Sequence, residues 1–153
     1  MFDNVLLTDC NKLNELLKNE KEQNSSLLLE AIYTSLLIRL HDILNSLDKK
    51  QRSTVAFAGD ITIDKQSNIN DIFDLIRIHR NAACHTKSGW KYVNKKILFS
   101  FNVVKERCSN ALKISGHIFG CDYTDDIALY YGPWRVYFKR HIQKLLERLN
   151  KLN

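Results

Sequence analysis

The stretch that decides the fold is Asp71-Ile-Phe-Asp-Leu-Ile-Arg-Ile-His-Arg-Asn-Ala-Ala-Cys-His85, in the middle of the chain. Apolar residues recur at helical spacing through its first half, which predicts an amphipathic helix. These positions are Ile69, Ile72, Phe73 and Ile76. The second half gathers Arg80, Asn81 and His85 at short range, with only small side chains between them. We therefore treat this segment as the centre of both the fold and the candidate site.

Helical spacing also recurs on both sides of this segment. Five glycines and one proline are few for a chain built from tight turns, so the sequence predicts an all-α fold. We expect one domain over residues 1–153, a bundle of about five helices in up-and-down order. The expected helices cover residues 5 to about 20, about 27 to 47, 68–70 to 85–89, about 102 to 117, and a last segment that opens with Gly132-Pro133. Residues 48–67 show no clear helical period, and so long a connection is expected to be functional, mobile, or to hide an element without a period.

The chain is basic, with a net charge of +6. This excess suits an acidic partner such as nucleic acid, and it is equally compatible with a plain basic soluble protein. Polar residues break up the N-terminus, so it lacks the pattern of a secretory signal. The longest apolar run, residues 27–40, is interrupted by Glu30 and Arg39. We expect a cytoplasmic protein.

The four cysteines lie far apart and form no C-x-x-C pair, so the sequence predicts neither a disulfide framework nor a zinc site. We expect buried free thiols that act as small apolar residues. The cysteines are Cys10, Cys84, Cys108 and Cys121. The chain also lacks a glycine-rich phosphate loop, a helix with paired metal ligands and a G-x-S-x-G elbow, so we expect no cofactor and no metal.

The hexad Arg80-Asn81-x-x-x-His85 resembles the signature of the HEPN superfamily, in which an arginine and a polar residue precede a histidine. The resemblance covers this hexad and the all-helical fold, and it identifies no subfamily. It implies a metal-independent endoribonuclease, a toxin or defence effector that cuts RNA at a dimer cleft. The alternative that it implies is a non-catalytic module that binds RNA, or that pairs with a nucleotidyltransferase or an antitoxin.

The residue types in the hexad suit RNA cleavage without a metal, because the 2′-hydroxyl of RNA is itself the nucleophile. His85 suits proton transfer, since an unperturbed imidazole has a pKa of about 6.5. Arg80 suits stabilisation of the phosphorane, since it is permanently cationic and can bind two phosphate oxygens. Asn81 is expected to orient the histidine or to bind a phosphate oxygen. The products implied by the resemblance are a 2′,3′-cyclic phosphate and a 5′-hydroxyl.

The spacing of the hexad raises a geometric question. On an ideal helix, residues five apart lie about 140° apart around the axis, so Arg80 and His85 would not share a face. Either the helix ends before His85, or groups from two chains meet across a twofold axis. HEPN proteins typically dimerise so that both motifs line one cleft, and we therefore expect a homodimer with a composite site. Arg77, Lys87 and Lys91 are expected to contact the RNA backbone.

Two further interpretations remain open. The hexad can be a helix C-terminus that carries basic residues because they interact favourably with the helix dipole. A plain helical dimerisation protein would instead use the basic face of the last helix. That face holds Arg135, Lys139, Arg140, Lys144, Arg148 and Lys151. Arg135 and His141 also have a signature-like spacing, but Val136 follows the arginine and His141 falls on an apolar stripe. We expect His141 and His79 to be buried.

Overall fold

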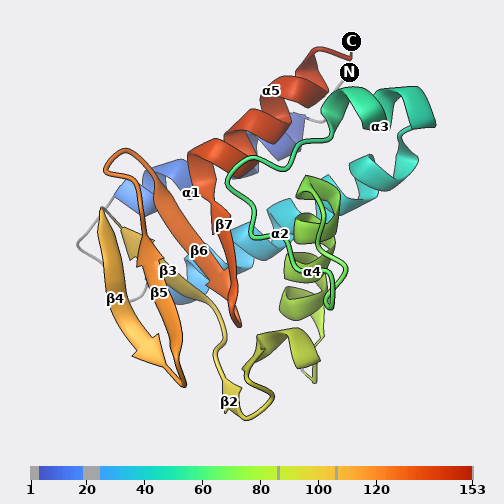
Figure 1. The fold of residues 1–153 in the computed structure, drawn as a ribbon. Helices are drawn as coiled ribbons and strands as arrows, with labels where there is room; N and C mark the ends of the chain where they lie inside the picture. The colour runs from blue at the N-terminus through green and yellow to red at the C-terminus, as the bar shows by residue number, and fades with distance from the viewer. Residues whose placement is uncertain (1–3, 19–24, 86, 106, 153) are drawn as a thin grey trace.

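The computed structural model describes residues 4–18, 25–85, 87–105 and 107–152, and it shows five α-helices and seven β-strands in them (Figure 1). The prediction of an all-α bundle is wrong, because residues 92–137 form antiparallel sheets. The helices are α1 (Asn4–Lys18), α2 (Ser25–Ser46), α3 (Lys49–Val55), α4 (Ile72–Cys84) and α5 (Lys144–Asn150). The strands are β1 (Tyr92–Val93), β2 (Ile97–Leu98), β3 (Asn102–Lys105), β4 (Cys108–Ile114), β5 (His117–Cys121), β6 (Ile127–Tyr131) and β7 (Trp134–Tyr137).

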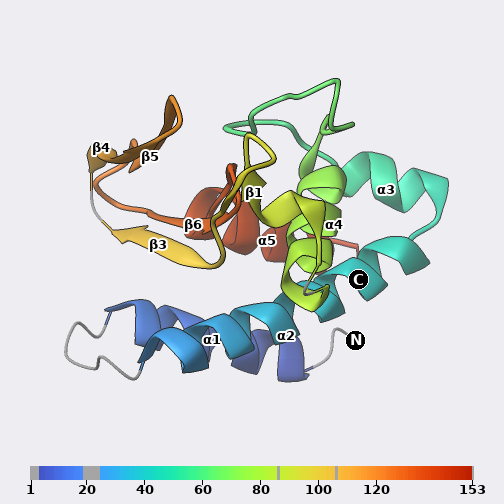
Figure 2. The ribbon, with the colours of Figure 1, turned by 90° about the horizontal axis from the view of Figure 1, so that it is seen from below.

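The first two helices lie side by side along one edge of the molecule (Figure 2). Both were predicted from helical period, and both bury the apolar stripe that predicted them. The buried stripe of α1 is Leu6, Cys10, Leu13 and Leu17, and that of α2 includes Leu29, Tyr33, Leu36, Leu40 and Leu44. Residues 19 and 20, to which the first helix was expected to extend, lie outside the described residues.

The central predicted helix is α4, and a side chain caps its N-terminus. Asp71 accepts hydrogen bonds from the backbone N–H groups of Phe73 (2.8 Å) and Asp74 (3.2 Å), which have no partner within the helix. The helix ends at Cys84, and His85 follows in an extended conformation. The buried face of α4 is Ile72, Leu75, Ile76, Ile78, His79 and Ala82. This face packs α4 against α2 and the sheet.

The long connection between α2 and α4, for which no helical period was found, contains the short helix α3. A capping box opens this helix: Asp48 accepts from the backbone of Gln51 (2.9 Å), and the Gln51 side chain accepts from the backbone of Asp48 (3.0 Å). Val55 is the buried residue of α3, so the sequence contains no apolar stripe that would predict this helix. The chain after α3 is fastened to α5, because the Arg148 guanidinium donates to the carbonyl of Ala56 (2.6 Å).

An antiparallel sheet in the order β3-β6-β7 forms the middle of the strand region. Successive side chains of its central strand β6 point to opposite faces of the sheet, and both faces are covered. Leu129 and Tyr131 face the large core shared with the helices, whereas Ala128 and Tyr130 face a second, smaller core. That smaller core consists of Val93, Phe99, Phe119, Cys121, Ala128, Tyr130 and Tyr137. The β4–β5 hairpin covers this outer face, and the β1–β2 hairpin follows α4 (Figure 1).

The helix predicted over residues 102–117 is wrong. These residues form β3 and the start of the β4–β5 hairpin, apart from residue 106, which lies outside the described residues. Apolar residues three and four apart suggested a buried helical face, but Leu112 is 47% exposed. Ser115 and Gly116 adopt positive φ (48° and 83°), and this left-handed pair makes a hairpin turn that a helix cannot contain.

The last helix begins later than predicted. Gly132-Pro133 forms the turn between β6 and β7 instead of the first turn of a helix, because Gly132 has a φ of 55° and β7 pairs with β6. Helical structure begins only at Phe138, where a π-helix (Phe138–Gln143) runs directly into α5. The apolar stripe was correctly recognised, but its first part belongs to a strand.

Gly132 joins this turn to the segment that follows α4. Its N–H donates to the carbonyl of Phe99 (2.7 Å). A Cβ at this position would lie 2.1 Å from the carbonyl oxygen of Trp90, which belongs to a short 3₁₀ helix (Gly89–Lys91). The rings of Trp90 and Trp134 meet edge to face, with centroids 6.1 Å apart. The turn therefore requires glycine for two reasons, a left-handed backbone and a close backbone approach.

We expect Gly132→Ala to lower the free energy of unfolding by about 2 kcal/mol or more, because the methyl group adds a backbone clash to a strained φ. Gly89→Ala is the matched control, since nothing lies within 4 Å of a Cβ at Gly89. Urea unfolding of both variants measures the difference. Equal stabilities would contradict the close approach at Trp90.

Candidate functional site

The hexad lies at the C-terminal end of α4. Arg80 and Asn81 belong to its last turns, and His85 is the first residue after the helix, with φ of −111° and ψ of 111°. The N–H of His85 still donates to the Asn81 carbonyl (3.1 Å). The helix thus ends before His85, which was one of the two expected solutions to the spacing problem. The side chain of His85 is exposed.

The Arg80 side chain is half-buried, and only part of its hydrogen-bonding capacity is used. One terminal nitrogen donates to Oδ1 of the neighbouring Asn81 (3.3 Å), whereas Nε is buried without a hydrogen-bond partner among the described residues. No carboxylate within the described part of the chain forms an ion pair with this guanidinium. Desolvation without a counter-charge is unfavourable, so such a group gains free energy when it meets an anion.

The other arginines on the two faces singled out by the sequence already have partners. Arg77, one turn before Arg80, donates to a carboxylate oxygen of Asp74 (3.3 Å) and to the carbonyl of Asn68 (3.3 Å). Arg77 also lines a small hollow of about 60 Å³ between α2, α3 and α4. On the basic face predicted for the last helix, Arg135 pairs with Asp122 (3.0 Å), and Arg140 pairs with Asp125 and Asp126 (both 3.0 Å).

The segment after α4 continues the basic character of the hexad. Lys87 is exposed, and Lys91 is half-buried in the 3₁₀ helix, which Ser88 caps. The β1–β2 hairpin that follows carries exposed Lys95 and Lys96 at its turn. Tyr92, at the base of this hairpin, is 37% exposed. Cationic and aromatic side chains therefore lie close together along residues 87–98.

A group of three polar side chains near the end of α4 was not anticipated. The hydroxyl of Tyr131 on β6 donates to Glu30 on α2 (3.1 Å) and lies 3.4 Å from the hydroxyl of Thr34. Burial raises the pKa of this phenol, and Cys84 at the end of α4 is close enough to contribute. These residues come from three elements distant in sequence, so no local motif could have indicated them.

His79 anchors α4 in the core, as expected from the apolar face that it continues. Its side chain is fully buried, and Nδ1 lies 3.1 Å from the hydroxyl of Tyr33. The rings of His79 and Tyr131 meet edge to face at 5.7 Å. Burial lowers the pKa of His79 to about 3, although the backbone of Trp134 opposes the shift. The imidazole is therefore neutral at physiological pH.

His141 is also buried, as expected. Its Nδ1 accepts from the backbone N–H of Tyr137 (3.0 Å), so its Nε2 carries the proton and donates to the carbonyl of Gly59 (3.2 Å). Burial lowers its pKa to about 4. This neutral, fully bonded imidazole is a structural link between the π-helix and the connection after α3.

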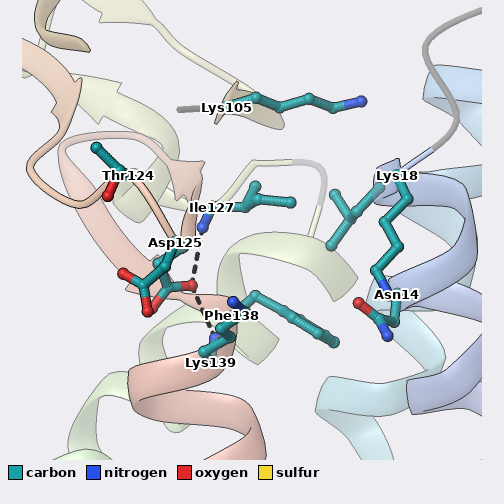
Figure 3. Close-up of a pocket in the computed structure, with 10 residues that line it drawn as sticks. Asn14, Lys18, Lys105, Thr124, Asp125, Ile127, Phe138 and Lys139 are labelled. Atoms are coloured by element: carbon teal, nitrogen blue, oxygen red, sulfur yellow. Dashed lines mark hydrogen bonds between the residues drawn. The ribbon is translucent and has the colours of Figure 1, made fainter. Parts of the chain in front are cut away.

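A pocket of about 290 Å³ lies elsewhere, between α1, β3, the loop before β6 and the start of the π-helix (Figure 3). Its lining residues are Asn14, Leu17, Lys18, Lys105, Thr124, Asp125, Asp126, Ile127, Phe138 and Lys139. None of the hexad residues contributes to it. No local motif indicates this pocket, because its lining comes from four separate segments.

The described residues contain no group of three or more histidines, cysteines or acids placed to hold a metal ion. The cysteines are free, as expected, but only Cys10 and Cys121 are buried. The expectation of burial is wrong for Cys84 and Cys108, which are exposed at the end of α4 and on β4. None of the described helices has the length and apolar character needed to cross a bilayer.

Comparison with protein-family models, with curated proteins and with solved structures found no match to the chain.

We expect the stability of the protein to fall between about pH 6 and pH 4, partly because of His79. Its pKa is depressed in the folded state, so only the unfolded chain takes up this proton as the pH falls below about 6.5. Each such proton changes the free energy of unfolding by about 1.4 kcal/mol per pH unit. Urea unfolding of wild type and His79→Gln between pH 5.5 and 4.5 tests this, and the variant should have the shallower slope. Identical slopes would contradict a neutral, buried imidazole at this position.

Proposed function

We propose that the protein is an RNA-binding, metal-independent endoribonuclease whose reaction takes place at the end of α4. The observation that carries the proposal is the environment of Arg80. Its half-buried guanidinium donates to Asn81 and has no carboxylate partner in the described chain. A scissile phosphate would supply the missing counter-charge. His85 caps the end of the helix, and its side chain is exposed.

The chemistry needs little beyond these groups. His85 would remove the proton from the 2′-hydroxyl or return one to the leaving 5′-oxygen, and Arg80 would stabilise the charge that develops on the phosphorane. Asn81 shares its side-chain oxygen with Arg80, and so holds the guanidinium in position. Because one chain contributes one such histidine, we propose that two chains pair and supply the acid and the base together.

The proposal rests on the residues at the end of α4 and not on an all-helical architecture. The resemblance to the HEPN superfamily therefore remains a proposal confined to the hexad. The strands of residues 92–137 do not remove the hexad from the surface, because the β1–β2 hairpin follows α4 and leaves His85 exposed.

A second candidate function is RNA binding without cleavage. The exposed Lys87, Lys95 and Lys96 and the exposed ring of Tyr92 favour it, because cationic and aromatic side chains together bind single-stranded nucleic acid. Binding of this kind weakens strongly as the salt concentration rises.

Purified wild type is expected to cleave single-stranded RNA in EDTA and to leave 2′,3′-cyclic phosphate and 5′-hydroxyl ends. His85→Ala and Arg80→Ala should each lower the cleavage rate about 100-fold or more, because they remove proton transfer and charge stabilisation respectively. Gel analysis of end-labelled RNA measures both the rate and the ends.

His41→Ala and Arg107→Ala are matched controls, since they remove a histidine and an arginine outside the hexad. Both should retain the wild-type rate. RNA binding without any cleavage by wild type would favour the binding function, and cleavage that survives both hexad substitutions would contradict the assigned roles.

A further inference from the structure

The pocket beside α1 brings three lysines together from distant parts of the chain (Figure 3). Lys18 ends α1, Lys105 ends β3, and Lys139 is the second residue of the π-helix. Figure 3 shows the Lys105 side chain extending along one side of the pocket toward α1, where Lys18 and Asn14 form the facing wall. None of the three ammonium groups forms an ion pair with a carboxylate that the structure describes.

Two carboxylates also line the pocket, but both are occupied. Asp125 pairs with a terminal nitrogen of Arg140 (3.0 Å). Asp126 is buried and accepts four hydrogen bonds, from the backbone of Ile127 (2.8 Å), Lys139 (2.8 Å) and Arg140 (3.0 Å) and from the Arg140 guanidinium (3.0 Å). Both acids therefore have partners in Arg140, and Asp126 also has them in the backbone N–H groups at the start of the π-helix, while Lys139 acts on Asp125 from a greater distance. Lys18, Lys105 and Lys139 add three positive charges to the lining.

The rest of the lining is mainly apolar. Leu17, Ile127 and Phe138 contribute hydrocarbon surface, and Asn14 and Thr124 add uncharged polar groups. In Figure 3 the ring of Phe138 points across the pocket toward α1. A ligand that fits this lining needs a compact carbon skeleton as well as negative charge. The volume of about 290 Å³ is at the lower end of the range for small-molecule sites.

We propose that this pocket binds a small organic phosphate, a phosphate monoester whose dianionic group lies among Lys18, Lys105 and Lys139 and whose carbon skeleton packs on the apolar lining. A dianion suits three ammonium groups better than a single carboxylate does, because lysines bind phosphate oxygens as point charges. Inorganic phosphate would leave the apolar surface uncovered. The π-helix that begins at the pocket adds to the argument, because π-helical turns are frequent at functional sites. This proposal is independent of the function proposed for the end of α4.

The test is calorimetric titration of the full chain with AMP, GMP, CMP and UMP, beside inorganic phosphate and a short RNA with and without a 5′-phosphate. We expect saturable binding of at least one mononucleotide or of the 5′-phosphorylated RNA. Lys105→Gln and Lys139→Gln should each weaken that binding about tenfold, because they remove a charge and keep the length of the side chain. Thr124→Trp should abolish it by filling the pocket from an exposed loop position.

Lys113→Gln is the matched control, an exposed lysine on β4 that lies outside the pocket. It should bind the same probe as wild type does. Arg80→Ala should also bind unchanged, whereas the pocket variants should retain any RNA cleavage, so the two proposals fail separately. Selective binding of the phosphorylated RNA would identify the terminal phosphate of RNA as the source of the monoester, and mononucleotide binding would identify a free metabolite.

Three results would overturn the proposal. One is that no probe binds at millimolar concentration. Another is that the pocket variants bind as tightly as Lys113→Gln. The third is that inorganic phosphate binds as tightly as the monoesters, which would show that the carbon skeleton contributes nothing.

Discussion

The buried contact between Tyr33 and His79 determines how the helices meet the sheet. A phenol on α2 and an imidazole on α4 lie within hydrogen-bond distance, and the ring of Tyr131 on β6 packs against both. Neither polar group has access to water, so the arrangement is stable only when the imidazole is neutral and the two groups remain together. This contact sets the position of α4 along α2, and thereby the place where Arg80 and His85 emerge.

Sequence period predicted α1, α2 and α4 because long amphipathic helices repeat one pattern over several turns. It failed for residues 92–137 for a physical reason. The strands there are two to seven residues long, and β6 is covered on both faces, so it shows no alternation of apolar and polar residues. Two signals were present, the turns at Ser115-Gly116 and Gly132-Pro133, and the second lies between segments rich in aromatic or β-branched residues.

The hexad could be found from sequence because its members are close neighbours in the chain, at the end of one helix. The pocket could not, because Lys18, Lys105 and Lys139 meet only after α1 packs beside the sheet. Charge counting was also incomplete, since it placed the basic residues near the C-terminus together on one possible functional face. Arg140 and Arg148 instead hold other segments in place, through buried Asp126 and through backbone carbonyls after α3. Sequence alone shows which charges are present, and the fold decides which remain unpaired.

Asp126 holds one wall of the pocket in place before any ligand binds. Its four hydrogen bonds fasten the loop before β6 to the first turn of the π-helix, so one wall of the pocket is held in its final shape by the folded protein itself. The conformational entropy of that wall is lost during folding and not during recognition. The pocket is thus preorganised on this side, and a small molecule that enters it has few protein groups to immobilise there.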